Sequence, residues 1–144
     1  MQGKWKNYLL KGGGLAVTIL LLAQALPIMQ PSNPLVVKEP AWDRPETRAL
    51  AKRACFDCHS NETVWPWYAN VAPMSWLVVY DVRGGRAEFN FSDWHDGDKP
   101  GRKADEEIRE GGMPLPQYLL MHPEARLTDA EKAQLRAGLL ATMK

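Results

Sequence analysis

The stretch CFDCHSNETVWPWY, residues 55–68, holds the only two cysteines of this 144-residue chain, and a histidine directly follows the second one. Cys55, Cys58 and His59 therefore form a C-x-x-C-H motif. Two thiols one helical turn apart can add to the two vinyl groups of one porphyrin, and the adjacent histidine can supply the proximal nitrogen to its iron. The motif predicts one covalently attached haem c.

Three other chemistries use paired cysteines, and each needs a feature that this sequence lacks. A thioredoxin-like dithiol needs a βαβ setting, but no alternating strand pattern surrounds the motif. A structural zinc site needs four ligands, and only His95 and His122 remain as further nitrogen donors, at irregular spacing. A disulfide across two intervening residues is geometrically poor and closes almost no loop. Covalent haem is the favoured interpretation.

The segment GGMPLPQY supplies a candidate for the sixth iron ligand. Met113 follows two glycines and precedes Pro114, so the local chain is expected to be an extended loop that can lay a thioether against a flat ring. The segment also lies just before a terminal helix, as in small cytochromes c. The competing interpretation is an ordinary buried methionine, because methionine commonly fills gaps in cores.

Other residues compete for roles at the haem. His95, in a charged loop, and His122, before Pro123, would each make the site bis-histidine and lower its potential. Weaker candidates for the distal ligand are Met74 and Met121. Two arginines are candidate partners for the haem propionates, although a solvated helix face is the commoner fate of such residues: Arg83 and Arg86.

An unusually large aromatic set could wall the haem or pack the core, and the sequence leaves both open. It comprises Trp65, Trp67, Tyr68, Trp76 and Trp94, and Trp42 could join either group.

The N-terminal segment has the pattern of an export signal. Three lysines precede an uncharged apolar run over residues 12–29, and no acidic residue occurs before Glu39. The run is near the lower length limit for crossing a bilayer as a helix, and Ala23-Gln24-Ala25 offers an A-x-A cleavage site. We expect the rest of the chain on the periplasmic side of a bacterial inner membrane, anchored by this helix, or free in the periplasm if the leader is cleaved.

Charge separates the leader from the rest of the chain. The formal net charge is +1 from 18 basic and 17 acidic residues, but three of the basic residues belong to the leader, which leaves 15 basic against 17 acidic groups beyond it. Nucleic acid is therefore an unsuitable partner, because phosphate binding needs a concentrated basic face. We expect redox proteins as partners, with the membrane contacted through the N-terminal helix.

The sequence divides into three regions: a signal peptide or membrane anchor over 1–29, a proline-rich spacer over 30–41 and a haem-binding domain over 42–144. Within the domain, Asp43 is expected to cap a helix whose third position is Glu46, which places the cysteine motif at a helix end. A second helix is expected over 73–86, frayed or ended by the paired glycines at 84 and 85.

The C-terminal part of the domain is expected to be helical after a polar loop over residues 90–103. A short helix over 104–112 should stop at paired glycines, and Thr128 with Glu131 should form the capping box of a terminal helix. That helix can bury Leu135, Leu139 and Met143. Because no strand pattern is visible, the predicted class is all-α, a small cytochrome c-like domain around a covalent haem.

Four segments together carry a family resemblance: CFDCHSNETVWPWY, APMSWLVVYDV, NFSDW and MPLPQYLLMHPEARLTDAEK. They resemble the bacterial haem-binding domain family of small exported c-type cytochromes, in this order and over nearly the whole chain. The resemblance implies an all-helical monohaem domain with haem on Cys55 and Cys58, His59 proximal and Met113 distal.

We expect a cytochrome that shuttles single electrons, without a catalytic residue of its own. The alternatives are a haem enzyme of the peroxidase kind and a haem-based redox or gas sensor, both with an open distal site. A carrier stays six-coordinate and resists external ligands, whereas an enzyme or a sensor binds them readily.

Overall fold

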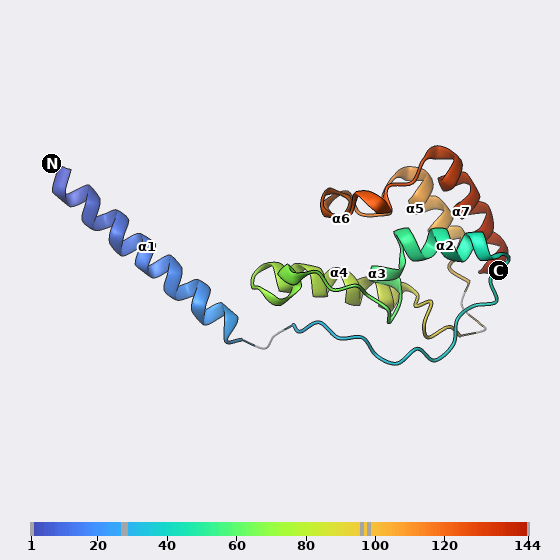
Figure 1. Cartoon of the computed structure of the whole chain (residues 1–144), viewed down its shortest axis with the longest axis horizontal. Coiled ribbons are helices and arrows are strands. Elements are labelled where there is room, and N and C mark those ends of the chain that lie inside the picture. The colour runs from blue at the N-terminus through green and yellow to red at the C-terminus, as the bar shows by residue number, and fades with distance from the viewer. Residues whose placement is uncertain (1, 27–28, 96, 98, 144) are drawn as a thin grey trace. The chain divides into compact units, whose positions relative to one another are not determined.

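The protein is all-α. The computed structural model describes residues 2–26, 29–95, 97 and 99–143. These residues form seven α-helices and two short 3₁₀ turns, and they contain no sheet (Figure 1). The elements are α1 (Gln2–Gln24), α2 (Pro45–Ala54), α3 (Phe56–His59), η1 (Trp67–Asn70), α4 (Met74–Glu88), α5 (Gly101–Glu110), α6 (Pro116–Met121), η2 (Pro123–Ala125) and α7 (Asp129–Thr142). The predicted all-α class is confirmed.

The chain forms two compact units. One consists of Met1–Ser32 with Trp65–Tyr80, and the other of Asn33–Val64 with Asp81–Lys144. The first unit holds α1, η1 and the first half of α4. Across the described residues, no helix has both the length and the apolar composition needed to cross a membrane.

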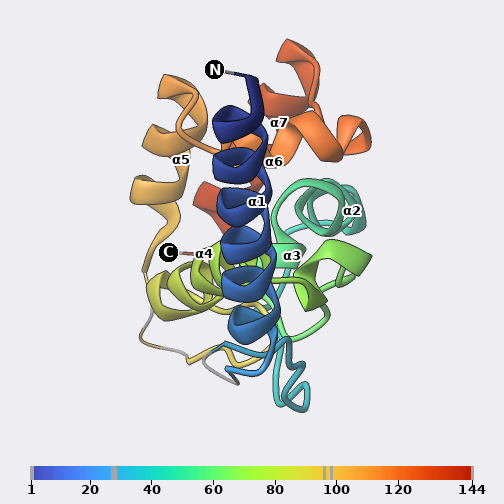
Figure 2. The same cartoon turned by 90° about the vertical axis from the view of Figure 1, so that its left-hand side faces the viewer.

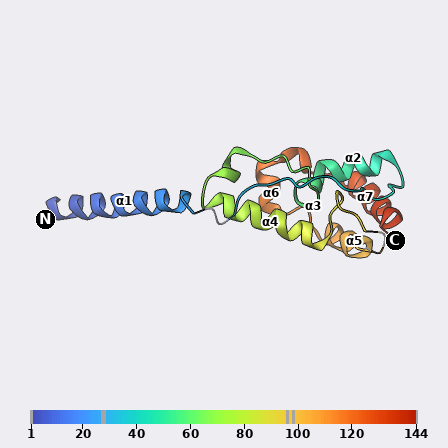
Figure 3. The ribbon, with the colours of Figure 1, turned by 90° about the horizontal axis from the view of Figure 1, so that it is seen from below.

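The second unit is built around α7. Helix α7 packs against α5 and α2, and α2 contacts α3 (Figures 1, 2 and 3). Leu135, Leu139 and Met143 are 1–2% exposed, as expected from the helical spacing of the terminal segment. The other buried apolar residues of this core are Ala51, Ala54, Phe56, Phe91, Trp94, Ala104, Ile108 and Leu127.

The first helix of this unit begins differently from the prediction. Its N-cap is Arg44, which makes no side-chain capping bond, and Pro45 opens the helix. The prediction that Asp43 caps it is wrong, because Asp43 is engaged with the far end of the chain. Its backbone N–H donates to Thr142 Oγ1 at 3.1 Å, and its Oδ1 accepts from the same hydroxyl at 3.3 Å.

Glycines mark one helix end as expected but not another. Gly111 ends α5 in the left-handed conformation (φ 78°). Glycine adopts this conformation without strain because it has no Cβ. Helix α4 instead continues through Gly84 and Gly85 to Glu88, so the prediction that this pair ends the helix is wrong. The polar loop is also shorter than predicted, since α5 begins at Gly101.

We expect the capping box of α7 to contribute measurably to stability. Thr128 Oγ1 accepts from the N–H of Glu131 at 3.2 Å, while Glu131 Oε2 accepts from the N–H of Thr128 at 2.8 Å. Replacing Thr128 by Ala should lower the free energy of unfolding by about 1 kcal/mol, because the N–H of Glu131 loses its side-chain acceptor. Urea unfolding followed by circular dichroism measures the difference. Thr128→Ser keeps the hydroxyl and should retain most of the stability; equal losses in both variants would contradict a capping role.

Candidate haem site

The cysteine motif lies at the junction of two helices. Cys55 follows α2, with its N–H donating to Ala51 O at 2.8 Å, and the next four residues form α3. The N–H groups of Cys58 and His59 both donate to Cys55 O, at 3.1 and 2.9 Å. The predicted placement at a helix end is therefore confirmed. The two hydrogen bonds to Cys55 O close a tight turn that contains Cys55, Cys58 and His59.

Phe56, inside the motif, fastens this turn to the core. Its side chain is 2% exposed and stacks on Phe91, with ring centroids 5.2 Å apart. Trp42 in turn lies 5.0 Å from Phe91. The core thus fixes one side of the turn.

One cavity of about 270 Å³ brings the four candidate residues together, since Cys55, Cys58, His59 and Met113 all line it. Met113 lies just after Gly111 and Gly112, and its N–H donates to Glu107 O at 3.2 Å. The apolar part of the wall is formed by Ala54, Gly85, Phe89, Pro100, Ala104, Ile108, Pro114, Leu115, Leu135 and Leu139. The cavity therefore combines a largely apolar wall with two thiols, an imidazole and a thioether, and five charged residues also line it: Asp57, Asp81, Glu88, Lys103 and Glu107.

Phe89 holds the imidazole of His59 in two ways. The Phe89 carbonyl lies 3.3 Å from Nδ1, and the Phe89 ring stacks on the imidazole at 4.1 Å with an interplanar angle of 13°. Burial lowers the pKa of His59, so the ring is neutral at pH 7. With Nδ1–H donating to the carbonyl, the lone pair is on Nε2, the arrangement usual for a metal-ligating histidine.

Asp57, the middle residue of the motif, joins it to two other segments. Its Oδ1 accepts from Val64 N at 2.9 Å, and its Oδ2 accepts from the Tyr118 hydroxyl at 2.7 Å. Burial, followed by the bond to Asp57, raises the pKa of Tyr118, so this phenol is a neutral donor. Tyr118 belongs to α6, which follows directly on the Met113 loop. The hydrogen bond therefore couples the position of that loop to the cysteine motif.

Comparison with known proteins identifies the family. The model of the haem-binding domain family matches residues 18–141. The chain belongs to the haem-binding domain family. No curated protein and no solved structure matches it.

The cavity of this haem-binding domain fits the group that the family is named for. Haem presents two apolar faces and an iron that takes nitrogen and sulfur ligands, and the apolar wall, the neutral imidazole and the thioether suit both. The two thiols are free and not joined to each other. That Cys55, Cys58, His59 and Met113 hold the haem remains a prediction from the sequence.

The other chemistries find little support in the haem-binding domain. Burial raises the pKa of both thiols to about 12, with Asp57 and Asp81 adding to the effect at Cys58. Disulfide exchange needs the opposite, a thiol with a lowered pKa. The part of the chain that the structure describes contains no group of three or more histidine, cysteine, aspartate or glutamate side chains arranged to hold a metal ion.

The competing histidines are not among the described residues that line the cavity. His95 is exposed, in the polar loop. His122 stacks on Tyr118 at 4.0 Å, and its Nδ1 lies 3.1 Å from Tyr118 O, so it supports α6. Met113 is therefore the candidate distal residue that shares the cavity with His59.

The proposed propionate partners lie elsewhere as well. Arg83 is exposed, and Arg86 donates to Ser60 O at 2.7 Å and to Thr63 Oγ1 at 2.9 Å. Arg86 thus braces the residue that directly follows His59, a role that its sequence position does not reveal.

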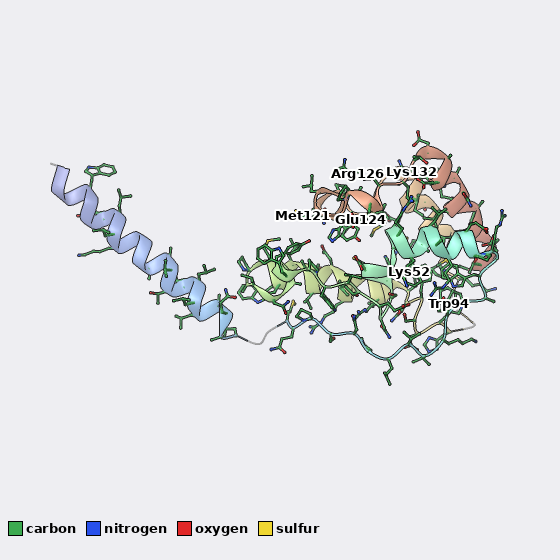
Figure 4. All side chains as sticks on the ribbon, viewed as in Figure 1. Lys52, Trp94, Met121, Glu124, Arg126 and Lys132 are labelled. Atoms are coloured by element: carbon green, nitrogen blue, oxygen red, sulfur yellow. The ribbon has the colours of Figure 1, made fainter. Side chains whose placement is uncertain are left out.

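The aromatic residues that line the cavity differ from those predicted from the sequence. Trp94 is 8% exposed in the core (Figure 4), and Trp42 packs against the same core on the ring of Phe91. None of the six tryptophans is among the described residues that line the cavity, whose aromatic members are Phe89 and Tyr118. Sequence reasoning missed both, because neither stands at a spacing that links it to the motif.

We expect Gly85 to be required by the site and Gly84 to be dispensable. A Cβ at Gly85 would overlap the carbonyl oxygen of Cys58, whereas one at Gly84 would meet no atom within 4 Å. Gly85→Ala should cost about 1–3 kcal/mol of stability through overpacking and reduce the haem bound per chain. Gly84→Ala should leave haem content unchanged and add up to about 1 kcal/mol, because alanine favours the helix.

The two glycine variants are compared by the ratio of haem to protein absorbance and by urea unfolding. Equal behaviour of Gly84→Ala and Gly85→Ala in both measurements would contradict the close contact between α4 and the motif.

Proposed function

We propose that this haem-binding domain is an exported monohaem c-type cytochrome that carries single electrons. The observation that supports it best is the shared cavity, in which two thiols, a neutral imidazole and a thioether meet among apolar side chains. A bound haem would supply an iron that cycles between its ferrous and ferric states.

Each of the four residues has a defined task in this proposal. The Cys55 and Cys58 thiols would each add across one vinyl double bond of the haem, sulfur to one carbon and hydrogen to its neighbour, so the attachment would consume no oxidant. His59 presents Nε2, while its Nδ1–H bond to Phe89 O fixes the ring and makes it a better donor. Met113 presents its sulfur from the loop behind α5.

The protein would tune the potential mainly through ligation and burial. A histidine and methionine pair gives a higher potential than two histidines. Most of the cavity wall is apolar, which disfavours the additional positive charge of the ferric state, while the lining residues Asp57, Asp81, Glu88 and Glu107 act in the opposite direction. The methionine ligand and the apolar wall both favour the ferrous state, which suits an electron carrier that accepts electrons from a donor of lower potential.

The N-terminal segment supports export. The lysines at 4, 6 and 11 followed by an uncharged run predict a signal peptide or a membrane anchor over 1–29, with the domain in the periplasm. The compact unit Asn33–Val64 with Asp81–Lys144 contains every residue that lines the cavity, and we propose it as the haem-carrying body. Its partners would be membrane-associated redox proteins. The intact mass of the protein purified from cells distinguishes a retained leader from one cleaved after Ala25.

We expect Met113→Ala to open the iron. The purified wild-type protein should give a low-spin visible spectrum that carbon monoxide does not alter in the ferrous form. The variant should turn high-spin, bind carbon monoxide at once and show a lower midpoint potential, because a thioether ligand is lost. Met121→Ala is the matched control, since Met121 is 61% exposed on α6 (Figure 4), and it should behave as wild type.

A wild-type protein that is high-spin and binds carbon monoxide readily would contradict the carrier. That result would instead favour an enzyme or a sensor with an open distal site.

A further inference from the structure

Residues 65–80, WPWYANVAPMSWLVVY, contain no charged side chain but three tryptophans and two tyrosines. They form η1 and the first half of α4, in the unit that also holds α1. Five of their large apolar side chains are 42–77% exposed and are together named the aromatic surface: Trp67, Val71, Met74, Leu77 and Tyr80. An exposed apolar set of this kind marks a contact site more often than chance.

The aromatic surface is the outward face of α4 and of the turn before it. Helix α4 buries Ser75, Val79 and Val82, which recur at helical spacing. Leu77 and Tyr80 lie on the opposite face, where a helix at a water boundary normally carries charged or polar side chains. Packing within the chain therefore gives no reason for apolar side chains on the exposed face of α4.

The end of α1 is joined to this surface through a paired hydrogen bond. The side-chain amide of Gln24 accepts from Ala72 N and donates to Ala72 O, both at 3.0 Å. These bonds satisfy the backbone polar groups of Ala72 without water, which a lipid environment requires.

The part of helix α1 that follows Lys11 presents apolar side chains on all sides, although α1 as a whole lacks the length and apolar composition needed to cross a membrane. Leu15, Val17, Ile19, Leu21 and Leu22 are 57–64% exposed. A helix that is apolar all round needs a non-aqueous surrounding. Gln24 is the last residue of α1, and its hydrogen bonds to Ala72 place the end of α1 next to residues 65–80. A non-aqueous medium around α1 would therefore also reach the aromatic surface.

We propose that the aromatic surface lies in the interfacial region of a lipid bilayer, next to the end of α1. Tryptophan and tyrosine prefer that region, because their rings enter the acyl boundary while the N–H or O–H group stays hydrated. A docking site for another protein would instead be rimmed by polar and charged groups, and 65–80 has no charge. The inference rests on the retained N-terminal anchor of the proposed function: it adds a membrane contact outside the leader and does not depend on electron transfer.

The test measures how deep the surface lies, in the full-length protein. Trp67→Cys and Leu77→Cys each receive a nitroxide label, and the haem-loaded chain is reconstituted into vesicles of phosphatidylcholine and phosphatidylglycerol. Paramagnetic resonance then compares collisions with oxygen, which concentrates in lipid, and with a nickel chelate, which stays in water. Val37→Cys is the matched control, because Val37 is 71% exposed in the other unit.

We expect the ratio of oxygen to nickel accessibility to be several-fold higher at positions 67 and 77 than at position 37. Equal, water-like ratios at all three positions would overturn the proposal. Low accessibility to both reagents with dipolar broadening between labels would also overturn it, since a second copy of the chain would then cover the surface.

The parent chain without an added cysteine keeps this test separate from the haem proposal. Thioether-bound cysteines take no label, so labelling of the parent would contradict covalent haem alone. The spectra at positions 67 and 77 would then be read as differences from the labelled parent.

Discussion

The contact between His59 and Phe89 is the constraint on which the site depends. A histidine that binds iron must be neutral, keep one nitrogen free and hold a fixed orientation. Phe89 contributes to all three properties of His59. The Phe89 carbonyl takes the Nδ1 proton, the Phe89 ring holds the imidazole plane, and burial disfavours its charged form. Phe89 directly follows α4, so the position of that helix decides the orientation of the histidine.

The remaining contacts hold α4 and the motif at this distance. Gly85 lets the helix approach the Cys58 carbonyl, and Arg86, one residue later, donates to the carbonyl of Ser60. On the other side, Asp57 accepts from Tyr118, which belongs to the segment behind Met113. The proximal and distal candidates are thus linked through short polar contacts within one unit of the protein, an arrangement that would preserve ligand geometry if a bound iron changed its charge.

Local signals in the sequence were sufficient for much of this account. The C-x-x-C-H motif needs only neighbouring residues, the capping box needs a spacing of three, and Gly111 ends a helix by its own conformational freedom. Met113 could be singled out because glycines precede it and a proline follows it. Each of these features is written within a few residues of the chain.

Features that depend on distant segments could not be predicted in this way. The sequence predicts Asp43 as a helix cap, but its partner Thr142 lies at the other end of the chain. It likewise predicts a helix end at Gly85, whereas the small size of this residue allows a close contact with Cys58. Phe89 and Tyr118 could not be predicted for the same reason, since only folding brings them to the motif.

The central claim, a haem bonded to Cys55 and Cys58, is tested most directly by the intact mass of the denatured protein from cells that mature c-type cytochromes. The account predicts a chain heavier by one haem in the wild type and by none in a Cys55→Ala, Cys58→Ala double variant; a wild-type chain without added mass would contradict it.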